Sequence, residues 1–466
     1  MSTSLITKSA LTAATRVAPL APRAAAIAIP PLLRRGFASI SSTPITSSTT
    51  RSHRIIVVGG GAAGLSISHQ LLRSGQFSPS EIAVIDPATH HHYQPGWTLV
   101  GGGLKDPLSL RRDEASLINP KLKFYNTAVS TLSPDSNSVT LSNGDKLSYE
   151  HLVVVPGIEI VYDKIKGLPE ALADGSSMVS TIYGANTVAK VFPTIERLKR
   201  GQAIFTQPAG VVKCAGAPQK VMWMALDHWK RAGLYNTSNP GEGAIKIAFA
   251  TALPTMFGVP KYAARLEELR KERGVEGLFS HDLVEVNGDK AVFQHGEEKV
   301  TRQFDLLHVV PKMGPYKFVK DSAVADPAGF VEVNQATTQH VRYPNVWSAG
   351  DASSLPTSKT AAAITAQAPV LVENLLRTLE GKEVVGEYDG YTSCPLVTQY
   401  GKVMLAEFKY GGVPKETFGG LPVVGGALDQ GTPRRMFYYL KKDFFPWVYY
   451  QAMVKGIWAG PKGWKF

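Results

Sequence analysis

Cysteine is scarce in this chain, and long apolar runs are missing. Only two cysteines, Cys214 and Cys394, occur among 466 residues, which excludes a disulfide-scaffolded secreted protein and a zinc site built from four cysteines. No run of 18 or more apolar residues occurs, so no transmembrane helix is expected. Apolar residues make up 44% and charged residues 19% of the chain. These values are typical of a globular protein, and the length suits roughly two to three domains.

Acidic residues are absent from the first 80 positions. The first acid is Glu81, whereas residues 1–50 carry five Lys or Arg and are rich in Ser, Thr and Ala. This composition is typical of an organelle-import presequence, and a secretory signal would need a longer apolar stretch. The segment after Arg35 resembles a mitochondrial processing site with cleavage after Phe37. We therefore predict a presequence at 1–37 and a Ser/Thr-rich linker at 38–52; the alternative is a merely disordered, basic N-terminus.

A glycine-rich turn follows the first predicted strand. The elements are, in order, a strand at 54–58, the glycines Gly59, Gly61 and Gly64, a helix at 65–73 and a strand at 81–85. In such a βαβ unit the glycines let the backbone approach a pyrophosphate, which lies at the helix N-terminus. Asp86 ends the second strand and can accept hydrogen bonds from a ribose. An ordinary turn is the alternative, but the four elements together favour a dinucleotide site.

Strands and helices alternate along the rest of the chain, which predicts an α/β fold. The further predicted strands are at 152–155, 203–206, 245–250 and 306–310, and the further helices at 218–232, 261–273 and 359–379. The last of these helices contains Pro369 and is expected to kink there.

A second flavin signal lies at Tyr343–Asp351, where a short strand leads into Gly350 and Asp351. The segment has the form of the second FAD motif in flavoproteins with two dinucleotide domains. The helix after it would direct its N-terminus at the flavin N1–C2=O edge, which becomes negative on reduction. Lys359 and Thr360 would assist there. Taken alone, Gly350-Asp351 would be interpreted as an ordinary turn, but together with the first motif it favours a flavin site.

The second glycine fingerprint of an NADH-dependent flavoprotein is missing. It is expected after the strand at 203–206, but the loop at 207–218 contains no G-x-G-x-x-G and holds Cys214 instead. The next acid, Asp227, falls inside a predicted helix and not at a strand end. The flavin is therefore expected to receive its electrons from something other than NAD(P)H.

The two cysteines are the alternative electron donors, although a lone cysteine is more often an inert buried residue. Cys214 follows Lys213 and precedes a helix expected to start at Pro218, a setting that favours a thiolate. Cys394 is predicted to lie in a turn at 391–396. Two loop cysteines could meet over one flavin face.

With these motifs, the chain resembles the mitochondrial sulfide:quinone oxidoreductases of eukaryotes. The matching segments are 92–101, 212–220, 355–363 and 388–398. The resemblance implies two Rossmann-like domains and a C-terminal membrane-associating segment. The implied divisions are an FAD-binding domain at 53–165 and 330–385, a second Rossmann-like domain at 166–329 carrying Cys214, and a C-terminal region at 386–466 carrying Cys394.

The resemblance also implies the cofactor contacts. Ala62 and Ala63 would lie against the FAD pyrophosphate, Asp86 on the adenosine ribose, Gln94 and Val129 along the cofactor, Asp351 on the ribityl chain, and Lys359, Thr360, Ala361 and Ala362 at the isoalloxazine. FAD is expected to be non-covalent, because a third cysteine for a thioether is missing. Asp86 stands where many relatives have Glu, and Pro156 replaces a smaller residue near the flavin.

The implied reaction begins with Cys214 and Cys394 bridged, either directly or through an extra sulfur. Hydrogen sulfide would attack at Cys394 and leave a persulfide, and the Cys214 thiolate would donate to the flavin. Ubiquinone would take two electrons, and sulfite or glutathione would take the sulfur. The alternatives are a type II NADH:quinone oxidoreductase and a non-catalytic flavin-bearing membrane protein.

The C-terminal segment, 434–466, combines 11 aromatic residues with seven Lys or Arg and the single acid Asp443. We expect monotopic contact with the mitochondrial inner membrane, because such a mixture suits the headgroup region; the alternative is a helix packed on the core. The helical spacing is expected to break at Pro446. Nothing else in the chain supports nucleic-acid binding, and the triplet His90–His92 is interpreted as a solvated turn without a metal.

Overall fold

A computed structural model describes residues 51–423, 426–461 and 464–466. The described residues form one compact unit. The predicted presequence at 1–37 and all but the last two residues of the predicted linker lie outside the described residues.

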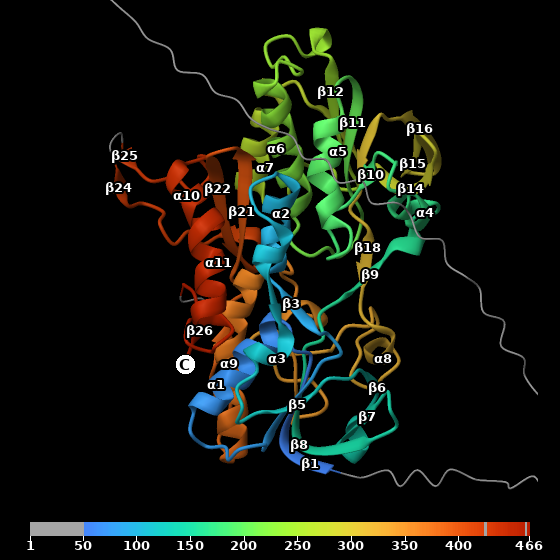
Figure 1. Cartoon of the computed structure of the whole chain (residues 1–466). Coiled ribbons are helices and arrows are strands. Elements are labelled where there is room, and N and C mark those ends of the chain that lie inside the picture. The colour runs from blue at the N-terminus through green and yellow to red at the C-terminus, as the bar shows by residue number, and fades with distance from the viewer. Residues whose placement is uncertain (1–50, 424–425, 462–463) are drawn as a thin grey trace, which may run out of the picture. The chain divides into compact units, whose positions relative to one another are not determined.

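The first sheet carries the glycine motif at the end of its central strand (Figure 1). Its strands run in the order β5-β2-β1-β8-β7-β6, with β19 beside β8. Their bounds are β1 Arg51–Val58, β2 Ile82–Ile85, β5 Lys123–Tyr125, β6 Val129–Ser133, β7 Ser138–Leu141, β8 Lys146–Val154 and β19 Val346–Trp347. The strands β5, β2, β1, β8 and β19 are parallel. The second flavin motif, which follows β19, therefore starts at the same edge of the sheet as the glycine turn after β1.

Both faces of this sheet are buried, as is usual for parallel strands. Ile55 and Val57 of β1 pack in one apolar cluster with Leu65 and Leu71 of α1 (Ala62–Arg73). The alternate β1 residues pack in a second cluster on the other face. Helix α9 (Ala361–Leu379) lies beside α1 and contains Pro369, as predicted.

The second sheet is wholly parallel, in the order β10-β17-β11-β12-β13. Its strands are β10 Val179–Ser180, β11 Gly201–Gln207, β12 Ile245–Thr251, β13 Glu276–Phe279 and β17 Leu306–His308, with helices α5 Val191–Arg197, α6 Ala217–Arg231 and α7 Pro260–Glu272. The predicted helices at 218–232 and 261–273 are confirmed within a residue. A short antiparallel pair, β9 (Glu159–Val161) with β18 (Lys312–Gly314), lies where the chain passes between the two sheets.

Smaller elements complete the chain. They are β3 His90–His92, β4 Arg111–Asp113, α2 Trp97–Gly101, α3 Glu114–Leu117, α4 Leu168–Ala173, α8 Lys317–Lys320, the antiparallel strands β14 Asp282–Asn287, β15 Lys290–His295 and β16 Glu298–Gln303, β20 Glu387–Tyr388, β24 Pro422–Val423, β25 Gly426–Ala427 and β26 Trp464–Lys465.

The C-terminal region packs an antiparallel sheet and a long helical stretch beside α6 and α9 (Figure 1). The sheet contains β21 Thr392–Gln399, β22 Lys402–Lys409 and β23 Val413–Pro414, and the helical stretch contains α10 Arg435–Tyr439, the π-helical turn η9 Leu440–Phe444, α11 Phe445–Val448 and the π-helical turn η10 Tyr449–Met453. The predicted break at Pro446 is wrong. Pro446 is the second residue of α11, which continues directly from η9, so the helical stretch runs through the proline. In the described part of the chain, no helix combines the length and the apolar character that crossing a bilayer requires.

Candidate flavin and dithiol site

A cavity of about 800 Å³ collects the segments that the sequence analysis singled out. It is lined by the glycine turn, the loop after β2, the loop before α6, the second flavin motif and the C-terminal helical stretch. The volume lies in the upper part of the range of ligand pockets, about 300–1,000 Å³.

The glycine turn is tight on one side and open on the other. A Cβ on Gly64 would lie 1.8 Å from the carbonyl oxygen of Gly59, and a Cβ on Gly59 would lie 2.4 Å from that of Val155. Around Gly61, by contrast, a Cβ would meet no described heavy atom within 4 Å. Because Gly61 lines the cavity at the start of α1, the open side is a cradle that suits a diphosphate at a helix N-terminus.

Asp86 lines the cavity next to this turn. Its carboxylate accepts hydrogen bonds from the backbone N–H of Gly60 (2.6 Å) and of Ala88 (2.7 Å). Asp86 therefore fixes the turn itself.

The second flavin motif closes the opposite end of the cavity. Asp351, Lys359, Ala361 and Ala362 line it, and Thr360 caps α9 by accepting a hydrogen bond from the N–H of Ala363 (3.0 Å). Burial lowers the pKa of Lys359 to about 8, and Asp351 opposes this effect. Burial also raises the pKa of Asp351, against the attraction of two lysines. The charges compensate one another at a helix N-terminus, which can stabilise a negative ligand.

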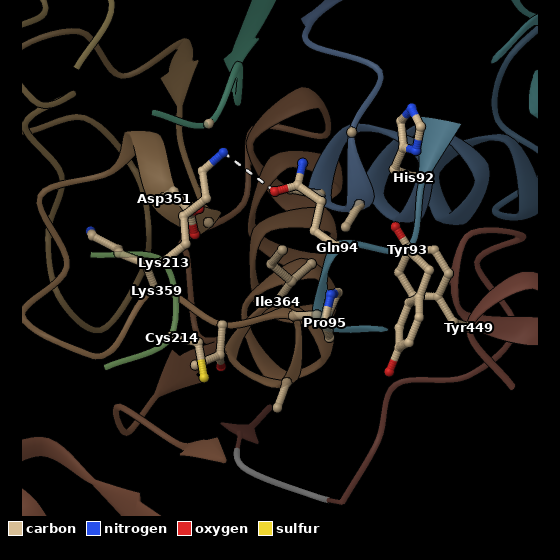
Figure 2. A pocket seen from close by; sticks show the side chains of 18 of the residues that line it. His92, Tyr93, Gln94, Pro95, Lys213, Cys214, Asp351, Lys359, Ile364 and Tyr449 are labelled. Atoms are coloured by element: carbon tan, nitrogen blue, oxygen red, sulfur yellow. Dashed lines mark hydrogen bonds between the residues drawn. The ribbon is translucent and has the colours of Figure 1, made fainter. Parts of the chain in front are cut away.

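Lys213 and Gln94 meet across the cavity. The Lys213 Nζ donates to Gln94 Oε1 at 3.3 Å, with Cys214 and Lys359 drawn close by (Figure 2). Burial lowers the pKa of Lys213, and Asp351 partly offsets it. Gln94 is one of the residues expected along the cofactor, whereas Lys213 was singled out only as the neighbour of Cys214.

The two cysteines converge, although 180 residues separate them: Sγ of Cys214 lies 3.8 Å from Sγ of Cys394. Cys214 is in a loop before α6, as predicted, and has a left-handed backbone with φ of 58°. Its N–H donates to the carbonyl oxygen of Lys359 at 2.7 Å. This bond ties the cysteine loop to the second flavin motif, and strain of this kind concentrates at functional sites.

The predicted turn around Cys394 is wrong. Cys394 is fully buried in β21, opposite Ala406 of β22. The neighbouring Pro395 suggested a turn, but β21 is an edge strand of its sheet, and edge strands tolerate proline. Cys394 does not line the cavity directly, whereas Ser393 and Pro395 do.

Two lysines that sequence reasoning missed face the thiols. Lys220 Nζ donates to Cys214 Sγ at 3.2 Å, and Lys441 comes from η9. Burial lowers the pKa of Lys441 to about 7, the charge of Lys220 adds to this effect, and the cysteines oppose it. One sequence feature could have indicated Lys220: it is a charged residue within an otherwise apolar helix face. The sequence contains no comparable feature at Lys441.

The thiols differ strongly in acidity. The hydrogen bond from Cys394, together with Lys220, holds the pKa of Cys214 well below its usual range. The same hydrogen bond and burial raise the pKa of Cys394 well above it. In the reduced pair, Cys214 therefore carries the thiolate and Cys394 keeps its proton.

Of the remaining predicted cofactor residues, most line the cavity and one packs beneath the glycine turn. Val129 and Gly350 line the cavity, together with Ala62 and Ala63, whereas Gly64 packs against the turn beneath it.

The interpretation of His90–His92 as a solvated turn is wrong. These residues form β3, which pairs with β4, and His91 is buried with hydrogen bonds to Glu114 and Tyr449. The described residues contain no group of three or more His, Cys, Asp or Glu placed to hold a metal ion.

Comparisons with known proteins agree on one family. Residues 53–190 match the pyridine nucleotide-disulphide oxidoreductase family. The chain is 45% identical to a mitochondrial sulfide:quinone oxidoreductase of Schizosaccharomyces pombe, over 91% of this chain and 95% of that protein. It is 40% identical to the mouse protein of the same name, over 89% of each chain.

A solved structure shows the same fold. The sulfide:quinone oxidoreductase of Aquifex aeolicus superposes with a TM-score of 0.71 and covers 85% of this chain and 91% of its own, at 17% identity.

Proposed function

Because the chain belongs to the sulfide:quinone oxidoreductases, flavoproteins of the pyridine nucleotide-disulphide oxidoreductase family, we propose that it oxidises hydrogen sulfide and reduces a quinone. The observation that carries this proposal is the pair of cysteines 3.8 Å apart at a dinucleotide-sized cavity. A pair of cysteines can accept the sulfur of sulfide and pass two electrons to a flavin. An enzyme whose flavin receives a hydride from a nicotinamide needs no such pair.

The flavin is FAD, bound without a covalent bond. The open side of Gly61 takes the diphosphate, Asp86 lies at the adenosine end, and Asp351 with the N-terminus of α9 lies at the isoalloxazine end. FAD supplies two-electron uptake from the thiols and release to a quinone. The chain contains only the two cysteines of the reacting pair, so none is left to form a thioether.

The difference in thiol acidity gives the direction of the sulfur step. Hydrosulfide attacks Sγ of Cys394 in the Cys394–Cys214 bridge, a bond to the incoming sulfur forms, and Cys214 leaves as a thiolate. The thiol of lower pKa is the better leaving group, and Lys220 stabilises it. An acceptor then takes the outer sulfur from Cys394, the bridge re-forms, and the two electrons released pass to the flavin and on to ubiquinone.

Sulfite or glutathione is the proposed sulfur acceptor. Both are anions, and the amino group of Lys220, which donates to Cys214 Sγ, favours an anionic nucleophile beside the thiols.

The protein is mitochondrial, and we place it on the inner membrane through its C-terminal segment. The side chains of Met436, Tyr439, Phe444, Trp447 and Ile457 are 40–59% exposed, while others of the same segment are buried. Phe444 also lines the cavity. The segment therefore packs on the core and offers an aromatic surface to lipid, which is the route expected for a long-tailed quinone.

Oxidation of NADH is the competing activity. The strand β12, beside β11, ends at Thr251 without an acid for the adenosine ribose of NADH, and Asp227 pairs with Arg231 on α6. The loop after β11 holds Cys214 in place of a glycine fingerprint.

Anaerobic titration of the FAD-loaded protein separates the two activities. We expect sulfide in excess, so that a second hydrosulfide can take the outer sulfur, to bleach the flavin absorbance, and NADH to leave it unchanged over the same time. Rapid bleaching by micromolar NADH, without bleaching by sulfide, would overturn the proposal.

A further inference from the structure

A buried carboxyl group that none of the motifs contains faces the cofactor cavity. Glu114 begins α3 directly after β4, its side chain is only 3% exposed, and it lines the cavity. A Cβ on Gly60 would lie 2.7 Å from Glu114 Oε1. The carboxyl group therefore touches the glycine turn.

Glu114 ends a chain of hydrogen bonds that starts in the C-terminal segment. The Tyr449 hydroxyl and His91 Nε2 are 2.6 Å apart, and His91 Nδ1 and Glu114 Oε2 are 3.2 Å apart. All three side chains are buried. Glu114 Oε1, however, has no hydrogen-bond partner among the described residues. An unpaired buried oxygen costs about 1–3 kcal/mol, so a ligand is expected to supply the partner.

Both hydrogen bonds form when His91 carries its proton on Nδ1. The Tyr449 hydroxyl donates to His91 Nε2, which leaves Nδ1–H to donate to Glu114 Oε2. Glu114 Oε1 can then hold a proton that only the cavity can accept. Burial, with a smaller contribution from the nearby Asp86, raises the pKa of Glu114, and His91 opposes this. A neutral carboxyl also suits a site next to Asp86 and an anionic diphosphate.

Asp86 does not donate a hydrogen bond to the cofactor. Both of its oxygens already accept backbone N–H groups. The diphosphate and ribose oxygens of the cofactor need donors.

We propose that Glu114, held by His91 and Tyr449, donates a hydrogen bond from Oε1 to a diphosphate or ribose oxygen of the bound cofactor. The proposal rests on the FAD site described above and adds to it a contact outside the glycine motif. Tyr449 is a positioning residue, and it couples the C-terminal segment to cofactor binding.

The test measures the FAD dissociation constant of apoprotein by quenching of flavin fluorescence. Glu114→Gln keeps a donor in the same place and is expected to bind FAD within about threefold of wild type. Glu114→Leu removes the donor and is expected to weaken binding tenfold or more, about 1.4 kcal/mol. Glu114→Met, which is closer in length, provides the same comparison if the leucine variant does not fold.

Two neighbouring tyrosines provide a matched control for positioning. Tyr449→Phe is expected to weaken FAD binding about threefold to tenfold, whereas Tyr450→Phe, which removes a buried hydroxyl bonded to the Leu110 carbonyl oxygen (2.7 Å), should not. The effect of Tyr449→Phe should disappear in the Glu114→Leu background, since a residue acting through Glu114 is non-additive with it.

The outcomes separate this inference from the proposed function. Wild-type FAD affinity in both Glu114→Leu and Glu114→Met overturns the inference alone, as do equal losses in the glutamine and leucine variants. Failure of the wild-type chain to bind FAD would overturn the proposed function instead.

Discussion

Alanine substitutions in the glycine turn should separate cofactor binding from folding. At Gly61 the backbone is extended, with φ of −65° and ψ of −167°, and a Cβ would enter open space. Alanine fits there without strain, so the free energy of unfolding of the apoprotein should stay the same or rise by about 0.4–1 kcal/mol. At Gly64 a Cβ would overlap the Gly59 carbonyl at 1.8 Å, and overpacking of this kind costs about 1–3 kcal/mol or more.

FAD affinity should respond differently. The methyl group of Gly61→Ala occupies the side where the diphosphate approaches the N-terminus of α1. Loss of a hydrogen bond to a charged group costs about 1.5–3 kcal/mol, which is roughly 10- to 150-fold in the dissociation constant. Gly64→Ala should lose FAD affinity only together with stability, because it displaces the whole turn.

Urea unfolding of the apoproteins, followed by far-ultraviolet circular dichroism, and flavin fluorescence titration measure the two quantities. Gly175→Ala is the matched control, since its Cβ also enters open space at an allowed φ, and Gly175 does not line the cavity. Wild-type FAD affinity in Gly61→Ala, or equal losses of stability in Gly61→Ala and Gly64→Ala, would refute the placement of the diphosphate.

Three further outcomes are expected. Cys214→Ser and Cys394→Ser should each keep FAD and lose several orders of magnitude in sulfide turnover. The double variant should turn sulfide over only slightly more slowly than either single variant, because the pair acts as a unit. Turnover within about tenfold of wild type, ~1.4 kcal/mol of barrier, would contradict the thiol mechanism. Trp447→Ser should weaken liposome flotation and slow reduction of long-tailed quinones, while Val341→Ser, an equally exposed site elsewhere, should do neither; unchanged flotation would favour core packing alone. The folded pKa of Lys441 is about 7 and lies below its unfolded value, so the unfolded chain binds one more proton between pH 7 and about 10. This residue therefore makes the free energy of unfolding rise by about 1.4 kcal/mol per pH unit in that range. Lys441→Met should flatten the rise measured by urea unfolding at pH 7.5 and 9, and an unchanged slope would show that the lysine stays charged.

The flavin site could be predicted because its signals are local. A strand, three glycines, a helix and Asp86 follow one another within 36 residues of β1, and backbone geometry alone dictates why glycine is needed at Gly59 and Gly64. The missing fingerprint after β11 was equally readable, since a loop either contains the glycines or does not. These features depend on contacts between residues that are close together in the sequence, so they can be recognised from the sequence alone.

The environment of the thiols could be predicted only in part. Lys213 and the helix start after Cys214 are sequence neighbours, and they indicated a favoured thiolate. Cys394 was predicted to lie in a turn at 391–396, and only the pairing of β21 with β22 shows that it belongs to an edge strand. Lys441 reaches the thiols from a π-helical turn whose hydrogen-bond register the spacing of apolar residues did not reveal.

The histidine triplet shows most clearly where sequence reasoning stops. Three adjacent histidines on an isolated peptide would be hydrated, and alternation on a strand leaves only the middle one pointing inward. Whether that histidine is exposed to solvent or buried depends on which other residues pack over it. Here η10 supplies Tyr449, which buries His91 and completes its hydrogen bonds. Glu114 in turn remains beside the glycine turn because His91 satisfies one of its oxygens. A residue from the last 20 positions thus fixes a carboxyl group at the first nucleotide motif, and no periodicity or spacing in the sequence encodes that contact.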